Sequence, residues 1–512
     1  MQTLLGIDVG TTGVKAVLFV AENDVVLADA FVDYPLYHPH LGWAEQNPAD
    51  WWQATLTAIR TCLVQGAAHG AQASNVRGVG VSGQMHGVVL LDAEQRVLRP
   101  CIIWADQRSD AQCRWMTERV GASRLIEYVS NPALTGFTAP KLLWIRDNEP
   151  EIFAKATTLL LPKDYIRYLL TGVMAIEISD AAGTCLLDVK HGKWSEEVLK
   201  ALELDPSLLP PVVAADAVCG TITEEAASLT GLRAGTPVAG GGADDACAAV
   251  GNGIILPGLG LVSIGTSGGV LAYADMSQVE TSGPVPQVHT FNHAVPHAWY
   301  LIGATQGAGL SLRWVRDNIG LPERALERWT DMDAYELLTR EAESIAPGSD
   351  GLIFLPYLQG ERAPHLDPYA RGGWIGLIAR HDRRHLIRSV LEGVAFSLKD
   401  CLGILREQGL QLERMRATGG GAKSPLWRQI IADVLGVELV TTNATEGPAF
   451  GAALLAGVAG GVYPSVQQAC EQTLRIVERT EPNPQAVHAY AQVYETYRAL
   501  YPALKPIISR PS

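Results

Sequence analysis

A short strand–turn–strand unit occurs twice in this sequence, about half a chain apart. In the first copy, strands over residues 4–8 and 14–20 flank the turn Gly10-Thr11-Thr12-Gly13. In the second copy, strands over 260–264 and 270–273 flank the turn Gly265-Thr266-Ser267-Gly268-Gly269. A unit repeated at this spacing indicates two domains of common origin. The length of 512 residues supports this prediction, because a chain of this size rarely folds around one core.

Between the two turns, apolar strand-like runs alternate with amphipathic helices, a pattern typical of a layered α/β domain. We predict strands over 76–82, 99–104 and 158–161, and helices over 48–65, 140–147 and 385–408. Asn47 followed by Pro48 marks the start of the first helix. The polar, glycine-rich segment 231–237 predicts a domain boundary near residue 235, which divides the chain into domains 1–235 and 236–512.

The composition restricts the partners of this protein. A formal net charge of −14 disfavours binding to nucleic acid, because the phosphate backbone would be repelled. The sequence has no run of 18 apolar residues, so we expect no membrane span, and its N-terminal residues show no secretion signal, so we expect a cytoplasmic protein. The eight cysteines are scattered without a Cys-x-x-Cys pair and are expected to be buried free thiols.

The first turn has the residues that a nucleotide phosphate site needs. Its glycines allow close approach of the backbone, Thr11, Thr12 and Lys15 offer donors, and Asp8 can hold Mg²⁺ through water. A plain hairpin turn explains this one motif equally well. The second turn, with Gly265, Thr266 and Ser267, favours a site in which two domains grip the phosphates from opposite sides.

A glycine-rich segment, residues 240–242, leads to Asp244 and Asp245 at the expected end of a strand and start of a helix. A carboxylate there suits a general base that accepts a proton from an attacking hydroxyl group. An aspartate at such a position is also a common helix N-cap. The spacing allows one aspartate to cap the helix while the other acts as base, and does not distinguish the two.

Two segments that follow predicted strands have the mixture expected of a sugar site. They are Gln84-Met85-His86 and Trp104 with Asp106, which combine polar groups for hydroxyls with an apolar surface. A histidine in such a segment is often purely structural, so His86 alone is weak evidence.

Taken together and in this order, these motifs resemble those of the FGGY carbohydrate kinases. Residues 136–148 and residues 372–392 are similar to that family's two signatures. The resemblance implies two ribonuclease H-like, actin-type α/β domains with the active site in the cleft between them. It also implies ATP and Mg²⁺ as cofactors, Asp244 as the base and a nucleotide loop at 418–424 that includes Gly420, Gly421 and Lys423. A homodimer is a further expectation from the family.

Within the family, the segments 42–48, 82–87, 161–165, 179–184 and 355–365 look like the branch that phosphorylates D-xylulose. The Met85-His86 pair is expected against the sugar, where a glycerol-specific member would carry an Arg-Glu pair. Members that act on gluconate also carry Met-His, so a kinase for ribulose, gluconate or glycerol stays an alternative. An ATP-binding protein of the actin-type fold without catalysis is a rival from another class.

The chain departs from the family at Asp245, where an uncharged amide is usual. Asp245 is nevertheless expected among the sugar-binding residues. A second carboxylate beside Asp244 raises at least one pKa of the pair. The substrate preference and the pH optimum are therefore the properties in which this protein is expected to differ from its family.

Overall fold

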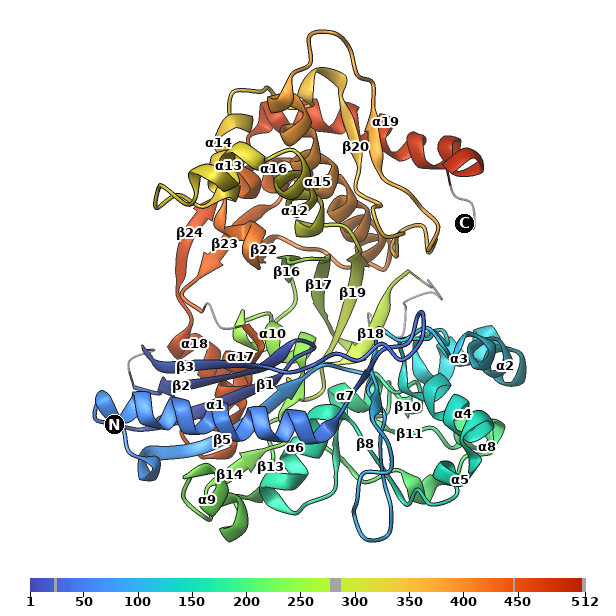
Figure 1. Ribbon diagram of the computed structural model, residues 1–512, viewed down its shortest axis with the longest axis vertical. Helices are drawn as coiled ribbons and strands as arrows, with labels where there is room; N and C mark the ends of the chain where they lie inside the picture. The colour runs from blue at the N-terminus through green and yellow to red at the C-terminus, as the bar shows by residue number, and fades with distance from the viewer. Residues whose placement is uncertain (23–24, 277–286, 445–446, 509–512) are drawn as a thin grey trace.

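The computed structural model describes residues 1–22, 25–276, 287–444 and 447–508. These residues form two lobes, each built on a seven-stranded sheet (Figure 1). The strands of the first sheet, in order, are β13 (Val218–Thr221), β14 (Pro237–Ala239), β5 (Val76–Gly83), β1 (Thr3–Val9), β2 (Gly13–Val20) and β3 (Val25–Asp33), and β15 (Gly242–Ala243) pairs beside β5. The strands of the second sheet are β18 (His289–Asn292), β19 (Trp299–Thr305), β17 (Gly268–Ala274), β16 (Leu259–Ile264), β22 (Arg414–Thr418), β23 (Glu438–Thr442) and β24 (Ile476–Thr480).

Both sheets share one topology. In the first lobe, β1, β2 and β3 form an antiparallel meander, and β5 and β14 continue the sheet in parallel beside β1. In the second lobe, β16, β17 and β19 form the meander, and β22 and β23 continue in parallel beside β16. Each predicted Gly/Thr turn joins the first two strands of its meander. The two repeated hairpins therefore begin two related α/β domains of the ribonuclease H-like, actin-type class, as predicted.

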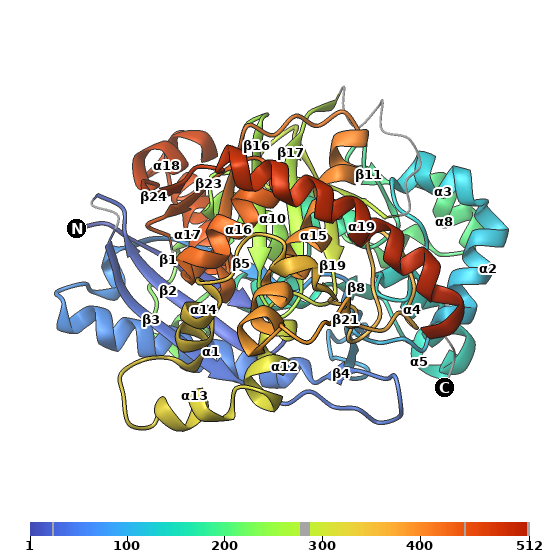
Figure 2. The same cartoon turned by 90° about the horizontal axis from the view of Figure 1, so that it is seen from above.

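The helices cover the two sheets and fill the ends of the lobes (Figures 1 and 2). The first half of the chain contributes α1 (Pro48–Ala68), α2 (Asp110–Val120), α3 (Ala122–Val129), α4 (Thr138–Asn148), α5 (Pro150–Phe153), α6 (Pro162–Thr171), α7 (Ile178–Ala182), α8 (Glu196–Leu202), α9 (Glu224–Thr230) and α10 (Asp244–Gly251). The second half contributes α12 (Gly309–Asn318), α13 (Leu321–Leu326), α14 (Ala334–Ala342), α15 (Arg383–Glu407), α16 (Pro425–Leu435), α17 (Gly447–Ala459), α18 (Val466–Thr473) and α19 (Pro484–Ile508). Figure 2 shows α19 running along the outside of the second lobe, where it packs against α15 and α16.

The predicted elements are present with small shifts in their bounds. Asn47 caps α1 by accepting a hydrogen bond from the Ala49 backbone N–H at 3.1 Å. The predicted strand over 99–104 is the exception, because only two of its residues pair with another strand. Short paired strands are β4 (Glu45–Gln46), β6 (Val89–Leu91), β7 (Cys101–Ile102), β8 (Thr158–Leu160), β9 (Ile176–Glu177), β10 (Leu187–Asp188), β11 (Lys193–Trp194), β12 (Val212–Val213), β20 (Ile353–Leu355) and β21 (Gly373–Ile375).

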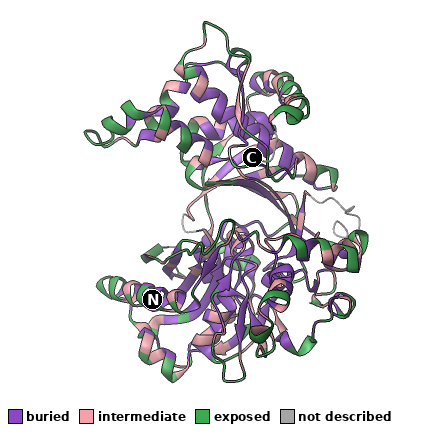
Figure 3. Ribbon diagram, turned by 45° about the vertical axis from the view of Figure 1, so that its right-hand side comes forward, coloured by how far each residue is buried: buried purple, intermediate pink, exposed green. Residues whose placement is uncertain are grey.

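Helix α17 comes from the second half of the chain but packs on the first sheet, against β1 and β5. Glycines permit this close contact. A Cβ atom on Gly6 would lie 1.8 Å from the Ala449 carbonyl oxygen, and one on Gly80 would lie 2.0 Å from that of Ala452. On the other face of the sheet, Leu18 lies against Gly66 of α1. The first sheet is thus enclosed between α1 and α17, with its centre buried (Figure 3).

The predicted boundary near residue 235 stays a prediction, and the strand pairing favours a later position. Strands β14 and β15 hydrogen-bond to β5 within the first sheet, and α10 packs on α17. We therefore propose that the first domain extends through α10, to about residue 251.

All eight cysteines are buried and free, as predicted. Within the described ranges, no helix combines the length and the apolar character needed to cross a bilayer.

Candidate active site

Three neighbouring strand ends bring the first predicted acidic residues together. In the register of the first sheet, Asp8 on β1 lies beside Ser82 on β5, and Ser82 lies beside Gly242 on β15. Asp244 follows directly after β15. Because these strands are parallel, their carboxyl ends meet at one edge of the sheet. The fold thus places Asp8 and Asp244 at the same edge, next to the first Gly/Thr turn.

Asp244 and Asp245 begin α10, and neither of them is its N-cap. That position is occupied by Ala243, which has no side chain to cap the helix. Burial raises the pKa of Asp244 well above its ordinary value, and the charges of Asp245, Asp8 and Asp180 raise it further. Burial also raises the pKa of Asp245 to about 6. A carboxylate with a raised pKa is a stronger base once it is deprotonated, which suits proton abstraction from a hydroxyl group.

The first turn is held by side chains from three other segments. Gln46 donates to the Thr11 carbonyl oxygen at 2.7 Å, and the Tyr34 hydroxyl donates to that of Gly10. Trp104 donates from its indole Nε1 to the Thr11 hydroxyl at 2.9 Å. These bonds fix the turn in one conformation and leave Thr12 exposed. A preformed turn of this kind is suited to phosphate binding, because its donors need no reorganisation.

Gln84 also supports the first turn. Its amide nitrogen donates to Gln46 Oε1 at 2.7 Å and to the Gly10 carbonyl oxygen at 3.3 Å, and its side chain is fully buried. Both amide hydrogens hold the turn, whereas Gln84 Oε1 is buried without a hydrogen-bond partner in the described part of the chain, so its contact with the sugar stays a prediction.

Met85 and His86 lie in a cluster of aromatic rings. The His86 ring is 4.8 Å from the Phe137 ring, and Phe137 in turn is 5.5 Å from the ring of His289 on β18. The Tyr300 hydroxyl donates a weak hydrogen bond to Met85 Sδ at 3.8 Å. Phe137 comes from the first half of the chain, whereas His289 and Tyr300 come from the second. Residues of both halves therefore pack around Met85 and His86.

The protonation state of His86 follows from its partner. His86 Nδ1 lies 2.7 Å from the Gly183 carbonyl oxygen, which can only accept, so Nδ1 carries the hydrogen. Burial lowers the pKa of His86 to about 3, and the ring is neutral at physiological pH. Nε2 is then an acceptor for a ligand hydroxyl. His86 has a positive φ of 74°, a costly conformation for a residue with a large side chain, as is often found at binding sites.

Two predicted site residues are bound elsewhere in the structure. Asp106 is fully buried, accepts hydrogen bonds from the Arg108 guanidinium at 2.7–3.0 Å and accepts another from the Ala44 backbone N–H at 2.6 Å. Its oxygens are thus occupied, and the prediction that it binds sugar is wrong. Lys15, predicted at the nucleotide, forms an ion pair with Asp29 of the neighbouring strand β3. Cross-strand charge pairing takes this lysine to the sheet instead of the turn.

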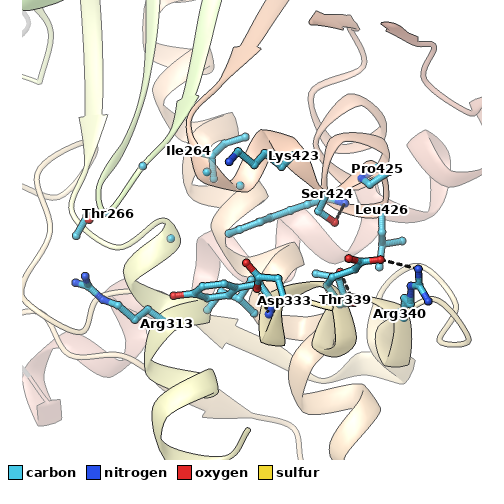
Figure 4. Close-up of a pocket in the computed structure, with 18 of the residues that line it drawn as sticks. Ile264, Thr266, Arg313, Asp333, Thr339, Arg340, Lys423, Ser424, Pro425 and Leu426 are labelled. Atoms are coloured by element: carbon cyan, nitrogen blue, oxygen red, sulfur yellow. Dashed lines mark hydrogen bonds and ion pairs between the residues drawn. The ribbon is translucent and has the colours of Figure 1, made fainter. Parts of the chain in front are cut away.

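The second turn borders a pocket of about 840 Å³ in the second lobe. Gly265 and Thr266 line it together with Gly420, Gly421 and Lys423, so five predicted nucleotide-binding residues meet there. Ser267, in the same turn, is exposed. Figure 4 shows Thr266 and Arg313 at one end of the pocket and Ser424, Pro425 and Leu426 at the other. The pocket is also lined by Arg313, Tyr335 and Trp427, which belong to no recognisable sequence motif and were not predicted.

A buried ionic network under the Asp244 segment was also missed. Lys163 lies 2.8 Å from Asp164, 3.4 Å from Asp180 and 3.6 Å from Glu177, and all four side chains are almost inaccessible to solvent. Glu177 accepts from the Ser179 hydroxyl at 2.7 Å, and Ser179 accepts from the Ala243 N–H at 2.9 Å. The segments 161–165 and 179–184 thus support the residue that precedes Asp244. In the sequence, charged residues lie between apolar runs in these segments, and this pattern could have indicated a buried ionic network.

The acidic edge offers an oxygen ligand for a divalent cation of the kind that accompanies ATP. Asp8 Oδ1 is buried without a hydrogen-bond partner in the described part of the chain, and burial raises the pKa of Asp8 to about 6. No group of three candidate ligand side chains occurs among these residues. One or two carboxylates with phosphate oxygens and waters are what Mg²⁺ usually receives in such sites, and the donor set fits that arrangement.

Comparison with known proteins agrees with this geometry. The N-terminal domain model of the FGGY family of carbohydrate kinases matches residues 3–251, and the C-terminal domain model matches residues 260–460. A xylulose kinase of Bacillus subtilis is 38% identical over 507 residues, with 99% of this chain and 98% of the relative covered. A gluconokinase of the same species is 33% identical over 460 residues, covering 90% and 88%.

The fold is similarly shared with solved structures. The crystal structure of a xylulose kinase from Brucella ovis superposes with a TM-score of 0.88 at 38% identity, covering 99% of this chain and 100% of that one. Family models together match most of the chain, and both domains are present in order. The chain therefore belongs to the FGGY family of carbohydrate kinases and is an ATP-dependent sugar kinase.

Proposed function

We propose that this protein transfers the γ-phosphoryl group of ATP to the primary hydroxyl of D-xylulose, giving D-xylulose 5-phosphate and ADP. The observation that carries the proposal is the Met85-His86 pair in its cluster of aromatic rings, just after the strand end that pairs with the strand leading to Asp244. The neutral His86 ring offers Nε2 to one sugar hydroxyl, and the apolar rings contact the carbon chain. The xylulose kinases among the relatives support this substrate over others.

The chemistry follows from the arrangement of the acidic edge and the two turns. Asp244 accepts the proton of the attacking hydroxyl as its oxygen bonds to phosphorus and the bond to the ADP oxygen breaks. The turn at Thr11 and Thr12 and the turn at Gly265 and Thr266 bind the phosphates from different lobes. Asp8 is proposed to hold Mg²⁺, which would neutralise charge on the phosphates. Gly420, Gly421 and Lys423 are proposed to contact the nucleotide.

The substrate is tested by an ADP-release assay with MgATP and a panel of D-xylulose, L-ribulose, D-ribulose, glycerol and D-gluconate. We expect the highest kcat/KM with D-xylulose. A higher value with another compound would keep the kinase and reject the substrate. No turnover on the whole panel would favour a non-catalytic ATP-binding protein instead.

D-Gluconate is the second candidate, because a gluconokinase lies among the relatives of this chain. The two substrates differ in charge, since gluconate carries a carboxylate at neutral pH. Asp245, with its additional negative charge beside the pocket, favours the uncharged ketopentose.

A further inference from the structure

One cation near the sugar pocket has no role in the reaction as described so far. Arg362 lies in a hairpin of the second lobe in which Glu361 and Asp367 exchange backbone hydrogen bonds, both at 2.9 Å. The residue is exposed. None of the ion pairs formed by the described residues involves its guanidinium, although nearly every buried arginine of this protein is paired with a carboxylate.

The hairpin that carries Arg362 is fixed at both ends. The buried Glu361 accepts from the Thr305 hydroxyl at 2.6 Å and from the Gln306 N–H at 2.8 Å, which ties the hairpin to the end of β19. Asp367 accepts from the Tyr501 hydroxyl of α19 at 2.6 Å. These bonds also occupy the neighbouring carboxylate Glu361. The hairpin therefore holds Arg362 in place without neutralising it.

The position of Arg362 relates it to the sugar side of the site. Its guanidinium carbon is 5.7 Å from the centre of the Trp104 ring, whose indole N–H holds the first turn. Cation and ring come from different halves of the chain. At this distance the ring face attracts the cation and orients it.

The groups that respond electrostatically to Arg362 are those of the proposed sugar pocket. Burial raises the pKa of Asp245, and the positive charge of Arg362 opposes that rise. Burial, with a smaller contribution from the charge of Arg362, lowers the pKa of His289 to about 4. The pKa of His86 is lowered mainly by burial, and the charge of Arg362 is among the smaller contributions that lower it. The positive charge of Arg362 thus acts on Asp245, His86 and His289, and among the described residues Arg362 forms no ion pair with Asp245.

We infer that Arg362 is a sugar-binding residue contributed by the second lobe, where it donates hydrogen bonds to oxygens of the bound ketose opposite His86 and Asp245. This inference rests on the proposed function of the pocket. An unpaired, preorganised guanidinium gives two or more donors to a ligand that offers only uncharged oxygens. It also offsets the charge of Asp245, the residue at which this chain departs from its family.

The test compares Arg362→Met with the wild type and with Arg371→Met. Arg371 is an exposed arginine nearby in the sequence whose guanidinium bonds only to the carbonyl oxygens of Pro368 and Ala370 among the described residues. The readouts are sugar affinity by calorimetry without nucleotide, the KM values for sugar and ATP, kcat, and the thermal midpoint. The sugar used is whichever compound the wild type phosphorylates best. A wrong substrate proposal is then seen in the wild type, and a wrong role for Arg362 only in the variant.

For Arg362→Met we expect sugar affinity to fall about 10- to 100-fold, the loss typical of a hydrogen bond to a charged group. The KM for ATP and the thermal midpoint stay unchanged, and Arg371→Met behaves as the wild type. Unchanged sugar affinity overturns the inference. A fall in kcat with unchanged sugar affinity also overturns it, because Arg362 would then act on the phosphoryl group. Should Arg362→Met not fold, Arg362→Gln is measured with the same criteria.

Discussion

Asp244 and Asp245 are two carboxylates of different environment on one turn of helix. Asp244 lies at the strand edge with Asp8, whereas Asp245 is influenced by Arg362 from the other lobe. Burial raises the pKa of Asp244, and the nearby charge of Asp245 raises it further. The coupling of the two carboxylates can therefore be measured in the acid limb of the pH–activity profile, where activity is lost as the pH falls.

Replacing Asp245 by Asn is expected to move that limb to lower pH. A base works only when deprotonated, so activity is lost as the pH falls through its pKa. Removing the neighbouring negative charge lowers the pKa of Asp244, and the loss then occurs at a pH lower by the order of one unit. The measurement is kcat/KM for the preferred sugar from about pH 5 to about pH 8, because a carboxyl group with a raised pKa titrates in this range.

Asp110→Asn serves as the control for this measurement, because Asp110 is an exposed carboxylate paired with Arg114 on α2. Its profile is expected to match the wild type. A limb that stays in place in Asp245→Asn would mean that the two aspartates are not electrostatically coupled in the working enzyme.

At the residue scale, the sequence predicted the groups that lie in a local motif. Asp8 and Asp244 meet at one edge of the first sheet, and the second turn and the 420–423 loop border one pocket, while their roles stay predictions. Asp106 was wrong as a sugar ligand, because its oxygens are occupied by Arg108 and the Ala44 backbone N–H through tertiary packing. Arg362 lies in the segment 355–365 that resembles the D-xylulose branch, but that resemblance gave no role to the residue itself, and His289 lies in no motif.

At the scale of elements, the packing of α17 on the first sheet depends on glycine. Gly80 on β5 and Gly6 on β1 leave no space for a side chain beneath the helix backbone. The sequence gives strand-like runs here, but the glycines themselves carry no indication of which helix covers them. This is why α17, which lies in the second half, was assigned to the second domain.

Gly80→Ala is expected to destabilise the protein. The added methyl group would lie 2.0 Å from the Ala452 carbonyl oxygen, so the helix backbone must move. Overpacking of this kind costs about 1–3 kcal/mol of unfolding free energy, measured by denaturant titration.

Gly403→Ala is the matched control. Gly403 lies inside α15, and a Cβ atom there has no neighbour within 4 Å. Alanine in a helix interior is favoured over glycine by about 0.5–1 kcal/mol, so this variant should be slightly more stable than the wild type. Equal stability of the two variants would show that the sheet and α17 are not in the tight contact described.

At the scale of the whole molecule, the two phosphate turns belong to different lobes, and residues from both pack around Met85 and His86. We expect the lobes to close when both substrates are bound, since the phosphate and the sugar must meet at Asp244. Small-angle scattering should show a smaller radius of gyration with D-xylulose and a nonhydrolysable ATP analogue than without them. An unchanged radius would mean that the lobes already hold their catalytic arrangement.

The central claim is that Asp244 takes the proton of the sugar hydroxyl at the junction of the two lobes. The direct measurement is the single-turnover rate of Asp244→Asn with D-xylulose and MgATP, alongside calorimetric affinities for each substrate. We predict a rate lower by about 10²- to 10⁴-fold, the contribution of a positioned general base, with both affinities close to those of the wild type. A rate near that of the wild type would contradict the claim and require the base to lie elsewhere.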